Sequence, residues 1–168
     1  MLFVNPQKYY WDTFTDIKHH QVYLNMYEQR LDSIERYINV VSAVASSTAI
    51  GGWVLWQHIQ FIWAFVIALS QVITATKPFL PFGQRLKALN GLTPEIEALA
   101  LTAETDWFKV SRSILTEEEI LALATTLKSR EKDATQKHFK GLVLPEQATL
   151  KDKADKATIA YMKSFQED

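Results

Sequence analysis

The sequence predicts an all-α membrane protein: a long N-terminal helix, a two-helix transmembrane hairpin and a C-terminal helical region. Three observations favour this architecture. Residues 37–76 contain no Asp, Glu, Lys or Arg, and 26 of these 40 residues are apolar. Apolar residues on either side of this segment recur three and four positions apart, which is helical spacing. Two helix-capping sequences, Thr93–Glu95 and Thr116–Glu119, lie in the C-terminal half.

Length and composition exclude several functional classes. The 168 residues correspond to about one domain. With 18 basic and 19 acidic residues the net charge is −1, which is not the strongly basic balance of proteins that bind genomic nucleic acid. The absence of cysteine excludes disulfides, thiolate metal sites and thiol nucleophiles. The first residues lack the basic region that opens a secretory signal, so we expect no cleavage there.

Residues 1–36 are predicted to form an amphipathic, coiled-coil-like helix that continues into the membrane segment. Its apolar seam alternates in steps of three and four, and consists of Ile17, His20, Leu24, Tyr27, Leu31, Ile34, Ile38 and Val41. Such a seam either packs on the C-terminal helices of the same chain or pairs in parallel with a second copy. Both interpretations stay open, and they are compatible.

Residues 37–77 are predicted to be the transmembrane hairpin, with spans at about 38–56 and 59–76. Crossing a hydrocarbon core of about 30 Å takes roughly 20 helical residues, so the segment suffices for two crossings. Trp53, Trp56 and Trp63 bracket the turn, where such rings favour the interface. Arg36 and Lys77 flank the segment, so the positive-inside rule places both termini in the cytoplasm. The alternative is a pair of buried helices in a soluble core.

The first span is the more polar of the two. Its candidate pore-lining residues are Asn39, Ser42, Ser46, Thr48 and Gly52, and its candidate gate residues are Val41, Val44 and Ile50. Small residues at four-residue spacing permit close helix packing within one hairpin. The other interpretation is an assembly of several copies, in which water in a central pore solvates the hydroxyl groups.

Residues 78–168 are predicted to form a cytoplasmic helical domain with three helices. The first begins at the Thr93–Glu95 cap and runs to about residue 112, with an apolar stripe of Ile96, Leu99, Ala103, Val110 and Ile114. The second follows the capping box at Thr116 and ends before Gly141. The third covers about residues 150–165.

No motif for catalysis is present, so we expect neither an enzyme nor a cofactor or metal site. The chain lacks a glycine-rich phosphate loop, zinc-protease histidine spacing and a serine elbow. Asp16, His19 and His20 share part of a helix face, but ordinary polar side chains are the favoured interpretation. Cationic side chains that are candidates for a phosphate-bearing ligand are Lys109, Arg112, Lys128, Arg130 and Lys132. A solvated helix face is the alternative.

The layout of the chain resembles that of the SLATT family of bacterial two-span effectors. The resemblance covers about residues 10–165. It rests on a polar helix with Tyr27, Arg30, Leu31, Ile34 and Tyr37, on the two close spans, and on the segments 77–82, 103–110 and 115–120. It depends on architecture and diffuse pattern rather than on an invariant motif.

The resemblance implies an oligomeric channel in the bacterial inner membrane that serves anti-phage defence. A companion nucleotidyltransferase, or a nucleotide or oligonucleotide signal, would gate the channel, and membrane depolarisation would then arrest growth. The family offers no catalytic residues to carry over, and its pore-lining first span corresponds here to Asn39–Gly52. A homo-oligomer is expected, with a tetramer as the working number. The alternative function is a non-conducting, membrane-anchored helical adaptor.

Overall fold

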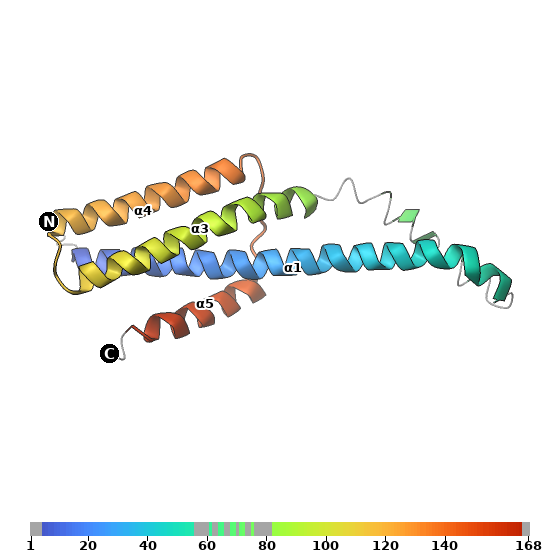
Figure 1. Ribbon diagram of the computed structural model, residues 1–168, viewed down its shortest axis with the longest axis horizontal. Coiled ribbons are helices and arrows are strands. Elements are labelled where there is room, and N and C mark those ends of the chain that lie inside the picture. Colours follow the sequence, from blue (N-terminus) through green and yellow to red (C-terminus); the bar gives the residue numbers. More distant parts are fainter. Residues whose placement is uncertain are drawn as a thin grey trace. The chain divides into compact units, whose positions relative to one another are not determined.

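The computed structural model describes residues 5–55, 61, 64, 65, 68, 69, 71, 72, 75 and 82–165, and the side chains of 44–55 and of residue 82 are outside the description. The described residues form α1 (Pro6–Leu55), α3 (Phe82–Ser111), α4 (Glu117–His138) and α5 (Ala148–Lys163) (Figure 1). The described residues between 61 and 75 are also helical. For this part of the chain, the all-α prediction is confirmed.

The chain divides into two compact units. The first, which we call the bundle, combines Met1–Glu28 with Lys87–Asp168, and the second comprises Gln29–Leu86. Helix α1 contributes to both units without a break in its helical backbone. The predicted continuous N-terminal helix is therefore present from Pro6 to Leu55.

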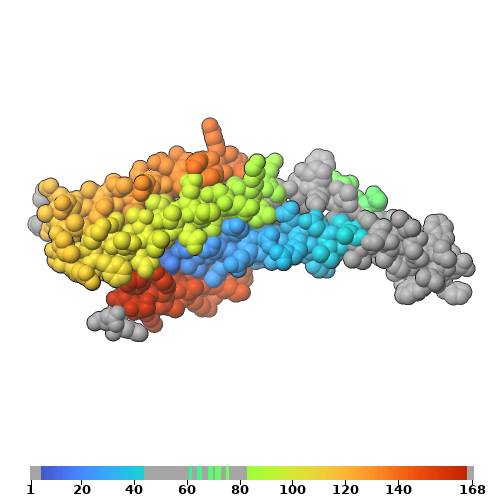
Figure 2. All heavy atoms as spheres, viewed as in Figure 1, coloured from blue at the N-terminus to red at the C-terminus, as the bar shows by residue number. Residues whose placement is uncertain are grey.

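Side-chain contacts fix the direction of α3 along α1 within the bundle. Gln7 Nε2 donates to the carbonyl oxygen of Val110 at 3.2 Å, and the Tyr10 hydroxyl donates to that of Ala103 at 3.0 Å. Because later residues of α1 meet earlier residues of α3, the two helices are antiparallel. Figure 2 shows α3 (yellow to yellow-green) between α4 (orange) and α5 (red) on one face of the bundle.

Helices α4 and α5 pack on α1 in opposite directions. Lys128 of α4 lies over the ring of Tyr9, with 4.6 Å between Nζ and the ring centroid, and Glu131 contacts His20 further along α1. Helix α4 is therefore parallel to α1. Helix α5 is antiparallel, since its C-terminal end meets Trp11 and Phe14 of α1 through Phe165.

The core of the bundle follows the apolar stripes of all four helices. Its largest fully buried side chains are Tyr10, Phe14, Ile17, Leu24, Tyr27, Leu89, Leu92, Ile96 and Val110. Burial of each such side chain contributes about 1.5–3 kcal/mol. The predicted seam of α1 thus packs inside the bundle at Ile17, Leu24 and Tyr27, which confirms packing on the chain's own C-terminal helices there. Ile34, Ile38 and Val41 are only half-buried.

The predicted start of the first C-terminal helix was wrong. We expected a cap at Thr93 and an N1 proline at Pro94, but α3 begins at Phe82 and carries Pro94 in its interior. A proline inside a helix removes one backbone hydrogen bond. Leu89, Leu92 and Ile96 are fully buried on both sides of it, so the apolar stripe continues through the proline and tertiary packing decides the local structure.

The other two C-terminal helices agree with the prediction. Helix α4 has the complete capping box, in which Glu119 N–H donates to Thr116 Oγ1 and Thr116 N–H donates to Glu119 Oε2. Helix α5 begins and ends two residues before its expected bounds. Ile114, expected on the buried stripe, is 67% exposed. The reason is that α3 ends at Ser111 and the chain turns at Ser113, whose φ is 54°.

Among the described residues, no helix combines the length and the apolar character needed to cross a membrane. Most of the predicted hairpin lies outside these residues. Its first span coincides with the helical backbone of α1 up to Leu55, while Trp56, His58 and Trp63 are not described. The transmembrane hairpin therefore stays a prediction.

Candidate functional site

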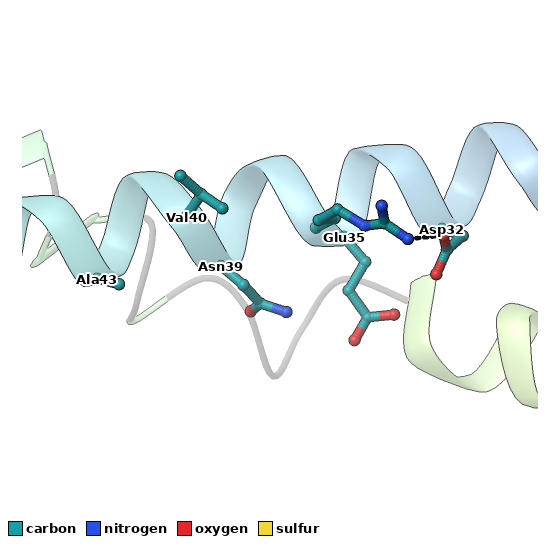
Figure 3. A pocket seen from close by; sticks show the side chains of 6 residues that line it. Asp32, Glu35, Asn39, Val40 and Ala43 are labelled. Atoms are coloured by element: carbon teal, nitrogen blue, oxygen red, sulfur yellow. Dashed lines mark hydrogen bonds and ion pairs between the residues drawn. The ribbon is translucent and has the colours of Figure 1, made fainter.

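The first pore-lining candidates belong to an exposed face of α1 in the second unit. Asn39 is exposed and Ser42 is half-buried. A surface hollow lies along this stretch of the helix (Figure 3) and is lined by Asp32, Glu35, Arg36, Asn39, Val40 and Ala43. Within the hollow, Arg36 Nη2 donates to Asp32 Oδ2 at 3.0 Å, one helical turn away.

The helical register divides the pore-lining and gate candidates between two faces of α1. A helix advances about 100° per residue. Positions 39, 42, 46 and 50 therefore fall on one face, together with Asp32 and Glu35. Positions 41, 44, 48 and 52 fall on the opposite face. By register alone, Ile50 is the gate candidate on the same face as Asn39, Ser42 and Ser46, and all of these candidates stay predictions.

The five cationic ligand candidates do not form one site within the described part of the chain. Lys109 Nζ donates to Asp106 Oδ1 at 2.7 Å, and Arg112 is exposed just beyond the end of α3. Lys128 lies on the ring of Tyr9. Arg130 and Lys132 are exposed on α4 without an ion pair among the described residues. Among the described residues, no contact joins Lys109 and Arg112 to the three candidates on α4.

Two histidines join α4 to its neighbours, a feature that sequence reasoning missed. His20 Nδ1 of α1 lies 2.7 Å from Glu131 Oε1 of α4. His138 Nε2 of α4 lies 3.0 Å from Glu95 Oε1 of α3. Both distances are those of hydrogen bonds. Within each pair, the histidine and its carboxylate are more than 40 positions apart. Spacing along the chain therefore does not reveal the partner of either histidine.

Glu95 is the acceptor for two residues of α4. Lys137 Nζ donates to the same carboxylate oxygen that His138 contacts. The hydrogen bond from Lys137 lowers the pKa of Glu95 below its ordinary value, and the bond from His138 acts in the same direction. The end of α4 is therefore attached to α3 through an ionised carboxylate.

His19 contacts the third neighbour of α1. Its Nε2 lies 2.8 Å from Asp155 Oδ1 of α5, although the contact lacks the alignment of a hydrogen bond. Adjacent histidines on α1 thus meet carboxylates on two different helices. Asp16, His19 and His20 do not converge, and the described residues contain no group of three side chains able to hold a metal ion.

The opposite side of the bundle carries a tyrosine–carboxylate contact. The Tyr161 hydroxyl of α5 donates to Glu104 Oε2 of α3 at 2.6 Å, and Lys18 Nζ lies 3.9 Å from the centre of the Tyr161 ring. Burial raises the pKa of Tyr161 to about 12, and the hydrogen bond to Glu104 acts in the same direction. This contact holds α3 and α5 together.

Trp107 and Phe108, which directly precede Lys109 in the sequence, belong largely to the packing of the bundle. Trp107 contacts Trp11, with ring centroids 4.6 Å apart, and stacks on Tyr10. Phe108 lies beside Phe165, which follows the end of α5, and remains about half exposed. Trp107 is therefore partly buried among the aromatic side chains of α1.

No family model, no curated protein and no solved structure matches this chain.

Proposed function

We propose that the chain is one subunit of a homo-oligomeric pore in the bacterial inner membrane. Residues 38–56 and 59–76 form the transmembrane hairpin, both termini are cytoplasmic, and the bundle receives the signal. The pore serves anti-phage defence: a companion protein, or a nucleotide or oligonucleotide, opens it, and depolarisation arrests growth. The proposed membership of the SLATT family rests on the sequence layout described above.

Exposed apolar side chains in the uncharged segment carry this proposal. Phe61, Phe65, Leu69 and Val72 are exposed by 92%, 68%, 48% and 58%. Their spacing of four, four and three positions places them on one face of a helix. Exposed large apolar side chains on one helical face are typical of protein or membrane contacts. Since the segment has no charged residue over 40 positions, lipid is the occupant that we favour.

The uninterrupted helix α1 supports a gating role for the bundle. Its buried N-terminal part lies in the bundle, and the same helix continues past the last charged residue, Arg36, into the predicted first span. A ligand that binds one packing of the bundle more tightly shifts the balance of packings by its differential affinity. The continuous backbone of α1 offers a direct route from such a change to the pore.

The lining face that we propose contains Asn39, Ser42 and Ser46, with Ile50 as the apolar constriction. Asn39 lines the hollow of Figure 3, and the helical register assigns the other three positions to the same face of α1. Neither span contains a charged residue, so the pore itself encodes no strong charge selection. Val41 and Val44 would instead face a neighbouring helix.

Expression toxicity provides the first test. We expect the intact chain to halt growth of a bacterial host on overexpression, and a double variant with Ser46→Leu and Ser47→Leu to insert normally without toxicity. The matched control, Thr125→Leu with Thr126→Leu, makes the same kind of change on the exposed side of α4. We expect this control to remain toxic. Undiminished killing by the Ser46/Ser47 variant would contradict a hydrated first span.

Conductance across planar bilayers separates the proposal from its two alternatives. The purified chain in detergent should produce ion currents that the Ser46/Ser47 variant lacks. Membrane insertion without current would instead identify the non-conducting adaptor. A monodisperse protein in buffer without detergent would overturn the transmembrane hairpin itself.

A further inference from the structure

We propose that the second half of α4, residues 128–138, is a proton-sensitive latch. Two histidine–carboxylate contacts hold it on the bundle, and loss of the imidazole protons loosens it. The proposal concerns the bundle alone, so it holds whether or not residues 37–77 form a membrane pore.

The two halves of α4 differ in apolar burial. In the first half, Ile120, Ala124 and Leu127 are buried. In the second half, Ala134 is the one buried residue among the described positions 128–138. A methyl group provides little hydrophobic stabilisation compared with the Leu and Ile side chains of the first half. Polar contacts therefore decide whether the second half stays attached.

The two contacts bind α4 to two different helices and with opposite polarity. Glu131 of α4 faces His20 of α1, whereas His138 of α4 faces Glu95 of α3. Each histidine side chain is less than one-third exposed, so solvent screens these contacts less than fully exposed pairs. Glu131 precedes Ala134 and His138 follows it, so α4 is held on both sides of its buried alanine.

Protonation of the imidazole changes the strength of both contacts. A neutral imidazole provides one ordinary hydrogen bond, whereas an imidazolium provides a stronger, charge-assisted bond to an ionised carboxylate. Imidazole is the side chain that changes charge between pH 5 and 8. The latch is therefore closed on the acidic side of this interval and looser on the alkaline side.

Neighbouring charged groups make the two contacts unequal. Lys137 also binds Glu95, so the α3 contact is partly maintained when His138 is neutral. Glu131 has no other ion-pair partner among the described residues, and Asp16 lies one turn before His20 on α1. The His19–Asp155 contact joins α1 to α5, and Lys151 of α5 lies near Asp155. This contact does not hold α4. The His20–Glu131 contact is consequently the more sensitive one.

Thiol labelling of a single cysteine introduced at a buried position reports on opening of the latch, because the chain has no native cysteine. We would introduce Ala134→Cys in the full-length chain and measure its rate of thiol labelling between pH 5.5 and pH 8. Each rate is divided by the rate for the denatured chain at the same pH, which removes the ionisation of the thiol itself. The corrected rate should rise by about tenfold on deprotonation of the two histidines. Ala124→Cys, in the first half of α4, is the matched reporter and should change little.

Histidine variants decide whether the two contacts cause the change. With His20→Gln and His138→Gln together, labelling at position 134 should be fast at every pH, while His58→Gln should retain the wild-type profile. His20→Gln alone should remove more of the pH dependence than His138→Gln alone. Helical content by circular dichroism confirms that each variant is folded. A flat profile in the unaltered bundle, or a wild-type profile in the double variant, would overturn the proposal.

Discussion

The imidazole ring of His138 occupies the space beside Gly91 into which a side chain would project. A Cβ atom at Gly91 would lie 2.5 Å from Nδ1 and 2.6 Å from Cε1 of His138. Contacts this short do not occur between real side chains, so the missing Cβ admits the ring against α3. Glu95, one turn further along α3, then meets Nε2 of the same ring. Gly91 is therefore a packing residue for the end of α4.

Gly91→Ala should destabilise the protein even though alanine is the better helix former. Alanine in a helix interior gains about 1 kcal/mol over glycine. Overpacking costs about 1–3 kcal/mol, because the His138 ring must move and leave Glu95. We expect a net loss of about 1 kcal/mol in the free energy of unfolding, measured by urea denaturation.

The sign of this effect should reverse once the ring is removed. In a His138→Ala background, Gly91→Ala should stabilise the protein by up to about 1 kcal/mol, because only the helix propensity remains. The same loss in both backgrounds would show that the close approach of His138 to Gly91 is not the cause.

The capping box of α4 predicts a second, pH-dependent effect. Thr116→Ala should lower the free energy of unfolding by about 1 kcal/mol. Two hydrogen bonds from Thr116 lower the pKa of Glu119. The bond from the backbone N–H has the larger effect, and the bond from the side chain the smaller one. A lowered carboxyl pKa stabilises the folded state at pH values above the ordinary pKa near 4.5. This stability is lost as the pH falls through the folded-state pKa.

Glu119→Gln tests that effect directly. Thermal melts recorded from pH 3 to pH 7 should show a lower melting temperature for the variant than for wild type at neutral pH. At acidic pH the two melting temperatures should become equal. Glu118→Gln, on the same helical turn and exposed, is the matched control. If both variants had the same pH profile, the stabilisation would come from the helix dipole rather than from the capping box.

Local sequence signals predicted the parts of the fold that local interactions determine. The capping box at Thr116 identified the start of α4 because both of its hydrogen bonds join residues three positions apart. The start of α3 was missed because packing of Leu89 and Leu92, which depends on distant helices, overrides the local preference of Thr93 and Pro94. The histidine contacts were missed for the same reason. His20 and Glu131 are 111 positions apart, and periodicity along one helix does not reveal its partner on another.

Burial of Tyr10 predicts a third effect. Its hydroxyl is fully enclosed and donates to the Ala103 carbonyl oxygen, and burial raises the pKa of Tyr10 far above its ordinary value. Tyr10→Phe removes this hydrogen bond and should cost about 1 kcal/mol of unfolding free energy at neutral pH. Tyr9→Phe changes a half-exposed neighbour in the same turn and should have a smaller effect. Equal losses in the two variants would contradict the importance of the buried bond.

Tyr161 predicts how the bundle responds to alkali. Its pKa is raised to about 12, whereas a tyrosine in the unfolded chain ionises near 10. The unfolded state therefore loses its phenolic proton first, so the contribution of Tyr161 is complete below pH 10 and is lost as the pH rises towards 12. Tyr161→Phe should reduce the fall in melting temperature between pH 9 and pH 11.5. Some fall should persist, because Tyr10 also has a raised pKa.

The Glu104 partner distinguishes the two causes of the raised Tyr161 pKa. Glu104→Gln keeps the burial of the phenol and an oxygen acceptor but removes the carboxylate charge at the 2.6 Å contact. Because burial is the larger cause, the spectrophotometric titration of Tyr161 in this variant should move only part of the way towards 10. A full return to 10 would assign the shift to the carboxylate alone. No movement would show that the Glu104 contact does not persist in solution, and α3 and α5 would then be held by apolar packing without it.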